Sequence, residues 1–214
     1  MRAIEPRTAA RRRRADESEA GDLWVFGYGS LMWQPGFDFL ERVPARLVGL
    51  HRALCVYSFV HRGTPERPGL VLGLDRGGTC RGIAFRVAAA DRAATVAYLR
   101  AREQVTSVYV ETVRRIELED ETRRPVRALC FIVDRGHVQY AGRLTLAERL
   151  HHVRQGHGRS GNNRDYVLQT VGALEALGYR ETDLHRLAEK LNSGIATEES
   201  CIRNQASRER FPDP

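Results

Sequence analysis

A glutamate near the end of a predicted helix has the surroundings that acid–base chemistry requires. The hydrophobic pattern predicts a helix from Asp91 to about Glu103, with Leu99 on its apolar face. Glu103 follows Leu99 by four residues, so its carboxylate lies on that same face. Burial and the negative end of the helix dipole are both expected to raise the pKa of this carboxyl group, as a general acid or base needs. A boundary glutamate paired with Arg100 or Arg102 explains the pattern equally well.

A glycine-rich turn follows the first apolar strand, which is predicted over residues 23–28. The turn runs through Tyr28, Gly29 and Ser30, and the chain then returns to apolar residues at Leu31. Such a turn can present bare backbone N–H groups that hold an anion or a developing oxyanion. A tight bend between two core strands is the simpler interpretation, and the short motif taken alone favours it.

Several tyrosines stand beside glycines, loops or strand edges: Tyr28, Tyr109, Tyr140 and Tyr166. Each, taken alone, is explained by ring packing and a hydroxyl bonded to the backbone. The polar stretch 158–166 leads into a predicted helix, where it either caps the helix or binds an anion.

Other kinds of catalytic site find little support in the sequence. His151, His152 and His157 form no ligand pair spaced four residues apart, so we expect no metal site. Ser30 follows Gly29 but lacks the G-x-S-x-G pattern of a nucleophile elbow.

The segments that would position these groups follow an α+β order. Strands are predicted at 23–28, within 45–59, and at 70–74, 82–87, 108–118 and 126–133. Helices are predicted at 91–103, at 145–155, from Asn163 or Asp165 to Gly178, and from Thr182 onward. Gly49 is expected at a bend or bulge, and the turn residues 75–78 predict a hairpin between 70–74 and 82–87. Because 126–133 is apolar on both faces, we expect it to be a central strand. The sheet is expected to be mixed or antiparallel and able to close as a small barrel.

Composition places one domain over residues 22–192, between a disordered arginine-rich tail over 1–21 and a polar tail over 193–214. The sequence contains neither an apolar run long enough to cross a membrane nor a secretory signal. The four cysteines lack C-x-x-C spacing, which favours reduced residues in a cytoplasmic protein. The net charge of +7 comes almost wholly from arginine, but 27 acidic residues are interspersed with these arginines. A solvated basic surface, suited to an anionic small substrate, is therefore favoured over nucleic-acid binding.

Several motifs in one order resemble the ChaC-like γ-glutamylcyclotransferases. The resemblance runs from about residue 24 to about 190 and rests on the stretches 26–38, 61–74, 98–103, 139–142 and 158–166. It implies a small mixed β-barrel with flanking helices, and cleavage of glutathione to 5-oxoproline and cysteinylglycine without a metal or cofactor. Leu31 in the Tyr-Gly-Ser-Leu stretch is similar to the branch of the family that acts on glutathione. This chain departs from the family at Met32, and at Thr106 and Ser107, where the family often has glycine.

The resemblance also implies roles for individual residues. Glu103 matches the catalytic glutamate of the family, and the backbone of the turn would bind the oxyanion and the substrate carboxylate. The residues implied to bind substrate are Tyr28, Gly29, Ser30, Leu31, Tyr109 and Tyr140. Action on other γ-glutamyl compounds, a catalytically silent binding domain and a nucleic-acid-binding protein are the alternatives, and the sequence specifies no oligomeric state.

Overall fold

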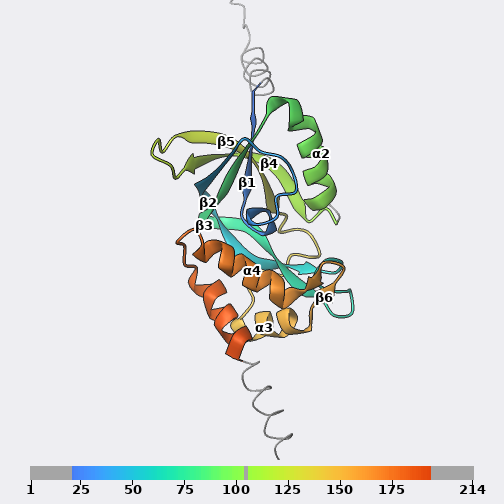
Figure 1. The fold of residues 1–214 in the computed structure, drawn as a ribbon. Coiled ribbons are helices and arrows are strands. Elements are labelled where there is room, and N and C mark those ends of the chain that lie inside the picture. Colours follow the sequence, from blue (N-terminus) through green and yellow to red (C-terminus); the bar gives the residue numbers. More distant parts are fainter. Residues whose placement is uncertain (1–20, 104–105, 194–214) are drawn as a thin grey trace, which may run out of the picture.

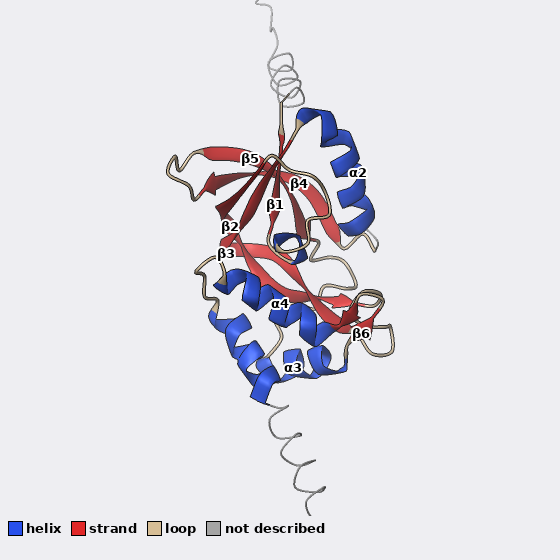
Figure 2. Ribbon diagram, viewed as in Figure 1, coloured by secondary structure: helices blue, strands red, loops and turns tan. Residues whose placement is uncertain are grey.

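The computed structural model describes residues 21–103 and 106–193, and the fold is a closed barrel of five strands flanked by helices (Figure 1). The barrel order is β1-β3-β2-β4-β5, with β1 Leu23–Gly27, β2 Glu41–Ser58, β3 Gly69–Val87, β4 Tyr109–Leu118 and β5 Pro125–Val133. The described helices are α2 Arg92–Glu103, α3 Leu146–Gln155, α4 Asn163–Glu175 and a helix over residues 182–193. Figure 2 shows α2 against the barrel and the other helices gathered together along the β2–β3 ribbon, at the other end of the molecule. The α+β barrel expected from the sequence is confirmed.

The sheet is mixed because one pair of strands is parallel. β1 runs parallel to β5, with Trp24 opposite Ala128, and antiparallel to β3, with Val25 opposite Phe85. β4 is antiparallel to both β5 and β2. β5 therefore has neighbours on both sides, as its apolar sequence predicted.

The two longest strands form one bent ribbon, and here the predicted hairpin at residues 75–78 is wrong. Residues 69–87 are a single strand, β3, that pairs with β2 along its length. Gly49 in β2 has φ +91°, and Gly77 and Gly78 in β3 have φ +94° and +69°. The register shifts at Gly49, so these glycines form the expected bulge and bend the ribbon without reversing it.

The helices beyond the barrel begin and end largely as predicted. Thr145 and Glu148 form the expected capping box at the start of α3. The cap of α4 is Asn162, which corrects the prediction of Asn163 or Asp165. The Asn163 side chain instead bonds to both backbone groups of Leu70, through its Oδ1 at 2.6 Å and its Nδ2 at 2.7 Å. This amide fastens α4 to the outer half of the β2–β3 ribbon.

Buried apolar side chains from all five strands and from the helices form one large core. Cys55, Cys80 and Cys130 are buried and free. Among the described residues, no helix is long and apolar enough to cross a membrane. The predicted tails, 1–21 and 193–214, lie outside the described residues except for Gly21 and Ser193.

Candidate active site

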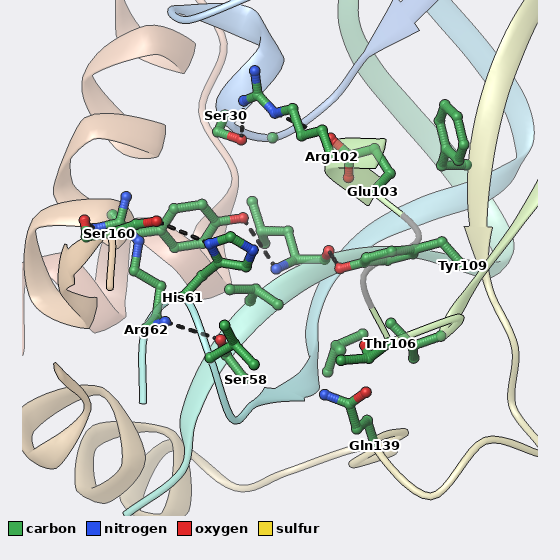
Figure 3. Close-up of a pocket in the computed structure, with 18 of the residues that line it drawn as sticks. Ser30, Ser58, His61, Arg62, Arg102, Glu103, Thr106, Tyr109, Gln139 and Ser160 are labelled. Carbon is green, nitrogen blue, oxygen red and sulfur yellow. Dashed lines mark hydrogen bonds and ion pairs between the residues drawn. The ribbon is translucent and has the colours of Figure 1, made fainter. Parts of the chain in front are cut away.

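A cavity of about 380 Å³ lies where β1 ends and β4 begins (Figure 3), and its volume suits a small molecule. Its walls come from the turn after β1, the end of α2, the start of β4, the outer half of the β2–β3 ribbon and Tyr166 of α4. The predicted residues Tyr28, Gly29, Ser30, Leu31, Glu103 and Tyr109 all line this cavity. Segments that are distant in the sequence therefore meet at one site.

Glu103 ends α2 and faces the cavity, as the helical spacing from Leu99 predicted. Its side chain is 19% exposed, and burial raises the pKa of its carboxyl group, which the charge of Arg102 lowers only in part. The Nε of Arg102 lies 3.4 Å from Oε1 of Glu103. The pairing with Arg102 and the orientation toward a cavity, which the sequence left as alternatives, are thus both present.

Arg102 also links Glu103 to the glycine-rich turn. Its Nη2 donates to the Ser30 hydroxyl at 2.9 Å, and its Nη1 donates to the Gln34 carbonyl at 2.7 Å and to the Tyr98 hydroxyl at 2.8 Å. The carboxylate and the turn are therefore held in one arrangement by a single planar guanidinium.

The glycine-rich turn presents unengaged backbone donors. Ser30–Met32 form a short 3₁₀ helix whose N-cap is Gly29. Within the described part of the chain, the N–H groups of Gly29, Ser30 and Leu31 make no hydrogen bond. Gly27 must be small, because an added Cβ would lie 3.0 Å from Cβ of Leu31. The turn therefore has the free N–H groups that an anion or oxyanion requires.

Two buried tyrosines, Tyr28 and Tyr166, and the partly buried Tyr109 line the cavity with the carboxylate, and their hydroxyls bond to backbone. Tyr28 donates to the Phe131 carbonyl at 2.9 Å and Tyr109 to the Leu72 carbonyl at 2.7 Å, while Tyr166 accepts from the Leu72 N–H at 3.1 Å. Burial raises the pKa of each, to about 12 for Tyr166, and the negative charge of Glu103 adds to each shift. These three tyrosine rings form part of the cavity wall near Glu103.

Tyr140 is the one predicted substrate-binding residue that the structure does not place in the cavity wall. Its hydroxyl donates to Oδ2 of Asp75 at 2.8 Å, and Arg135 donates to Oδ1 of the same carboxylate at 2.6 Å. The ring packs in a small separate cluster with Cys55 and Val56. The hydrogen bond to Asp75, in the bulged part of β3, therefore holds the Tyr140 side chain outside the cavity wall.

Its neighbour Gln139 does line the cavity, although the residue pattern did not single it out. Its backbone carbonyl accepts from the Tyr57 N–H at 2.8 Å, and its Nε2 donates to the Tyr57 carbonyl at 2.7 Å. This pairing adds residues 139–141 to the edge of β2 and fixes the amide of Gln139.

The wall opposite Glu103 carries His61, Arg62 and Ser160 (Figure 3), which sequence reasoning placed only within loops. His61 Nδ1 lies 2.9 Å from the Ser160 hydroxyl oxygen. Burial lowers the pKa of His61, and the charges of Arg62, Arg102 and Arg159 lower it further. The sequence signals were the density of glycine and proline in residues 61–69, the family resemblance of 61–74 and 158–166, and the possible anion binding of 158–166, but none gave these three residues a role.

The backbone conformation at Ser107 shows why the family often has glycine at this position. Ser107 adopts φ +58°, a left-handed conformation that glycine reaches without strain. Glycine is therefore the natural residue here, and this chain reaches Tyr109 through a strained serine.

Among residues 21–103 and 106–193, no group of three or more His, Cys, Asp or Glu side chains could hold a metal ion.

Comparisons with known proteins identify the family and the fold. The chain is 32% identical over 195 residues to the glutathione-specific γ-glutamylcyclotransferase of Escherichia coli (strain K12), covering 91% of this chain and 78% of that relative. It is 28% identical over 168 residues to the human glutathione-specific γ-glutamylcyclotransferase 1, covering 78% and 76%. The crystal structure of a yeast γ-glutamylcyclotransferase specific to glutathione has the same fold, with a TM-score of 0.75 at 22% identity over 81% of this chain and 96% of that one. A model of ChaC-like proteins matches residues 23–194, and the chain therefore belongs to the ChaC-like family.

Proposed function

We propose that this chain is a γ-glutamylcyclotransferase that cleaves glutathione to 5-oxoproline and cysteinylglycine. The observation that carries the proposal is the partly buried carboxylate of Glu103, whose raised pKa and free face toward the cavity suit proton transfer. The relatives that bear this activity in their names share the family with this chain.

The reaction needs no nucleophile from the protein. The α-amine of the γ-glutamyl group attacks its own γ-carbonyl carbon, which closes a five-membered lactam. The bond from that carbon to the cysteinyl nitrogen then breaks. Glu103 takes a proton from the attacking amine and gives one to the leaving nitrogen, so one carboxyl group acts first as base and then as acid.

The glycine-rich turn suits the charge that develops on the γ-carbonyl oxygen. The free N–H groups of Gly29, Ser30 and Leu31 would donate to the oxyanion or to the α-carboxylate of the substrate. Such preorganised donors cost no rearrangement during reaction. Holding the γ-glutamyl chain folded, with its amine facing the carbonyl, adds an orientation effect that can lower the barrier by several kcal/mol.

Two further features support glutathione as the substrate and the cytoplasm as the location. Leu31, the residue that resembles the glutathione-acting branch, lines the cavity. The cysteines at positions 55, 80 and 130 are free and buried, which suits a reducing compartment. A cyclotransferase acting on other γ-glutamyl compounds is the alternative.

The test is a product assay on purified protein with its glutamate variants. Incubation with glutathione should release cysteinylglycine and 5-oxoproline in equal amounts, measured by mass spectrometry. Glu103→Gln should lower kcat by at least about 100-fold, because general acid–base catalysis contributes about 10²–10⁴. Glu111→Gln is the matched control, since Glu111 pairs with Arg100 of α2 but does not line the cavity.

Each alternative has its own outcome in this assay. Full activity of Glu103→Gln would remove Glu103 from the proton-transfer role. Thermal stabilisation by glutathione without any product would indicate a silent binding domain. Faster cleavage of γ-glutamyl-alanine than of glutathione would assign the chain to the broader γ-glutamyl substrates.

A further inference from the structure

The cavity contains a positive charge that the proposed reaction does not use. Its lining includes three residues with full charges, Arg62, Arg102 and Glu103. Arg102 and Glu103 pair with each other. Arg62 has no carboxylate within ion-pair distance in the described part of the chain, although many other arginines there do.

The guanidinium of Arg62 is held in place on one side and open on the other. Its Nη1 donates to the carbonyls of Ser160 and Asn162, and its Cζ lies 5.3 Å from the centre of the Tyr166 ring. Its Nε and Nη2 make no hydrogen bond with other described residues. An anion could therefore bind to the free N–H groups without displacing any bond that the loop needs.

The electrostatics of this wall favour an anion. Burial lowers the pKa of Arg62, so its positive charge is partly desolvated without a paired negative charge. Arg62 also lowers the pKa of His61, together with Arg102 and Arg159, so a positive potential covers this side of the cavity. A carboxylate placed here would compensate that potential.

Arg62 and Glu103 lie on opposite sides of the cavity, as contacts with the two ends of a peptide substrate would require. Figure 3 shows Arg62 and His61 on one side of the cavity and Glu103 and Tyr109 on the other. Leu72 in the cavity lining connects Tyr166 and Tyr109, since its N–H donates to the Tyr166 hydroxyl and its carbonyl accepts from the Tyr109 hydroxyl. From the γ-carbonyl carbon, two extended residues would carry a terminal carboxylate roughly 7 Å across this floor.

We propose that Arg62 binds the C-terminal carboxylate of the leaving dipeptide, the glycyl carboxylate in glutathione. The site would then select γ-glutamyl dipeptides that end in a free carboxylate over γ-glutamyl amines and over the shorter γ-glutamyl amino acids. This inference rests on the proposed cyclotransferase activity, because it assigns the substrate's far end within that same cavity.

The test compares glutathione with its glycyl amide, in which the terminal carboxylate is replaced by a neutral group. Arg62→Gln should raise KM for glutathione about 10- to 100-fold, as expected for the loss of a charge-assisted bidentate contact, while kcat changes less than about threefold. The wild type should handle the amide with a similarly raised KM, and Arg62→Gln should change that value little. Arg62→Lys should recover part of the affinity for glutathione and none for the amide.

Arg67→Gln is the matched control, because Arg67 is an exposed arginine of the same loop that does not line the cavity and is not among the charges that lower the pKa of His61. Equal losses on acid and amide in Arg62→Gln would show that Arg62 only supports the loop at residues 160–162, and would overturn the proposal. Equal KM values of the wild type for the two substrates would overturn it as well.

A binding measurement separates this proposal from the reaction itself. Calorimetry with Glu103→Gln should show glutathione binding about 10- to 100-fold tighter than its amide, and Arg62→Gln in that background should remove the difference. This result would stand even if the wild type released no product, in which case only the proposed activity would fail. Equal binding of acid and amide, or no binding of either, would refute the carboxylate site whatever the turnover.

Discussion

Replacing Arg52 should destabilise the fold strongly and disturb the glycine-rich turn. The side chain of this β2 residue has no exposed surface. Its Nε donates to the Tyr28 carbonyl and its Nη2 to the Arg81 carbonyl, each at 2.5 Å. Its Nη1 forms an ion pair with Glu181, which precedes the helix over 182–193. One buried guanidinium thus joins the turn of the candidate site to the C-terminal helices.

The cost follows from what Arg52→Met leaves behind. Removing one partner of a buried ion pair typically costs 3–5 kcal/mol. Glu181 is 28% exposed and can regain some water, which places the expected loss at the lower end of that range. The two carbonyls left without a donor add to it, each costing about 1–3 kcal/mol when buried. We expect a loss of at least about 5 kcal/mol, a large share of the roughly 5–15 kcal/mol that holds a domain folded.

Urea denaturation of a double-mutant cycle measures this interaction. Glu181→Gln should also be destabilising, because it leaves a fully buried cation without its counter-charge. Arg52→Met with Glu181→Gln should cost clearly less than the sum of the two single changes, with a coupling of at least about 1.5 kcal/mol. The variants should keep a wild-type m-value if they unfold in one step.

The effect on the turn is read from activity under conditions where the variants are folded. Because the Tyr28 carbonyl loses its anchor, kcat for glutathione should fall in Arg52→Met. Additive single changes, or a loss below about 1 kcal/mol, would show that the pair contributes little and would refute this account.

Three further predictions concern the proposed base, the β2–β3 ribbon and the cap of α3. The kcat/KM for glutathione should rise with pH through a midpoint above the usual glutamate pKa of about 4.3. The reason is that Glu103 must be ionised to act as base, and burial raises the pKa of its carboxyl group. A midpoint at or below about 4.3 would contradict the assignment of Glu103 as the base. Gly82→Ala should lower the melting temperature far more than Gly49→Ala. An added Cβ at Gly82 would lie 2.4 Å from a β1 carbonyl oxygen, whereas an added Cβ at Gly49 would meet open space and only the strain of a left-handed φ. Similar decreases in melting temperature would argue against the contact at Gly82. Thr145→Ala should cost about 1 kcal/mol in urea denaturation and leave activity unchanged, since the capping box it breaks lies outside the cavity; altered activity would count against the placement of the site.

Short sequence patterns, such as helical periodicity and capping residues, predicted the elements whose structure depends on residues close together in the sequence. The apolar face of α2 led to Glu103, and the residues that cap α3 predicted its start. The glycines at 77 and 78 were misjudged, because positive φ angles serve a bulge as well as a turn. Only pairing with β2, a non-local contact, decides between the two.

The missing parts of the candidate site have the same cause. Arg62 and Gln139 lie in loops, and each reaches the cavity only because a partner far along the chain holds it there. The sequence could not show that Tyr140 lies outside the cavity lining, because its hydroxyl donates to Asp75, which is 65 positions away in sequence. No spacing rule reports such partners, whereas the ordered set of motifs predicted the family without them.

The bent β2–β3 ribbon connects two parts of the cavity that belong to different parts of the molecule. Its inner half belongs to the barrel, next to β1 and the turn that would face the reacting carbonyl. Its outer half is fastened to α4 and ends near the loop that carries Arg62. Changes in that outer loop can therefore alter the accepted leaving group while the barrel keeps its cyclising chemistry.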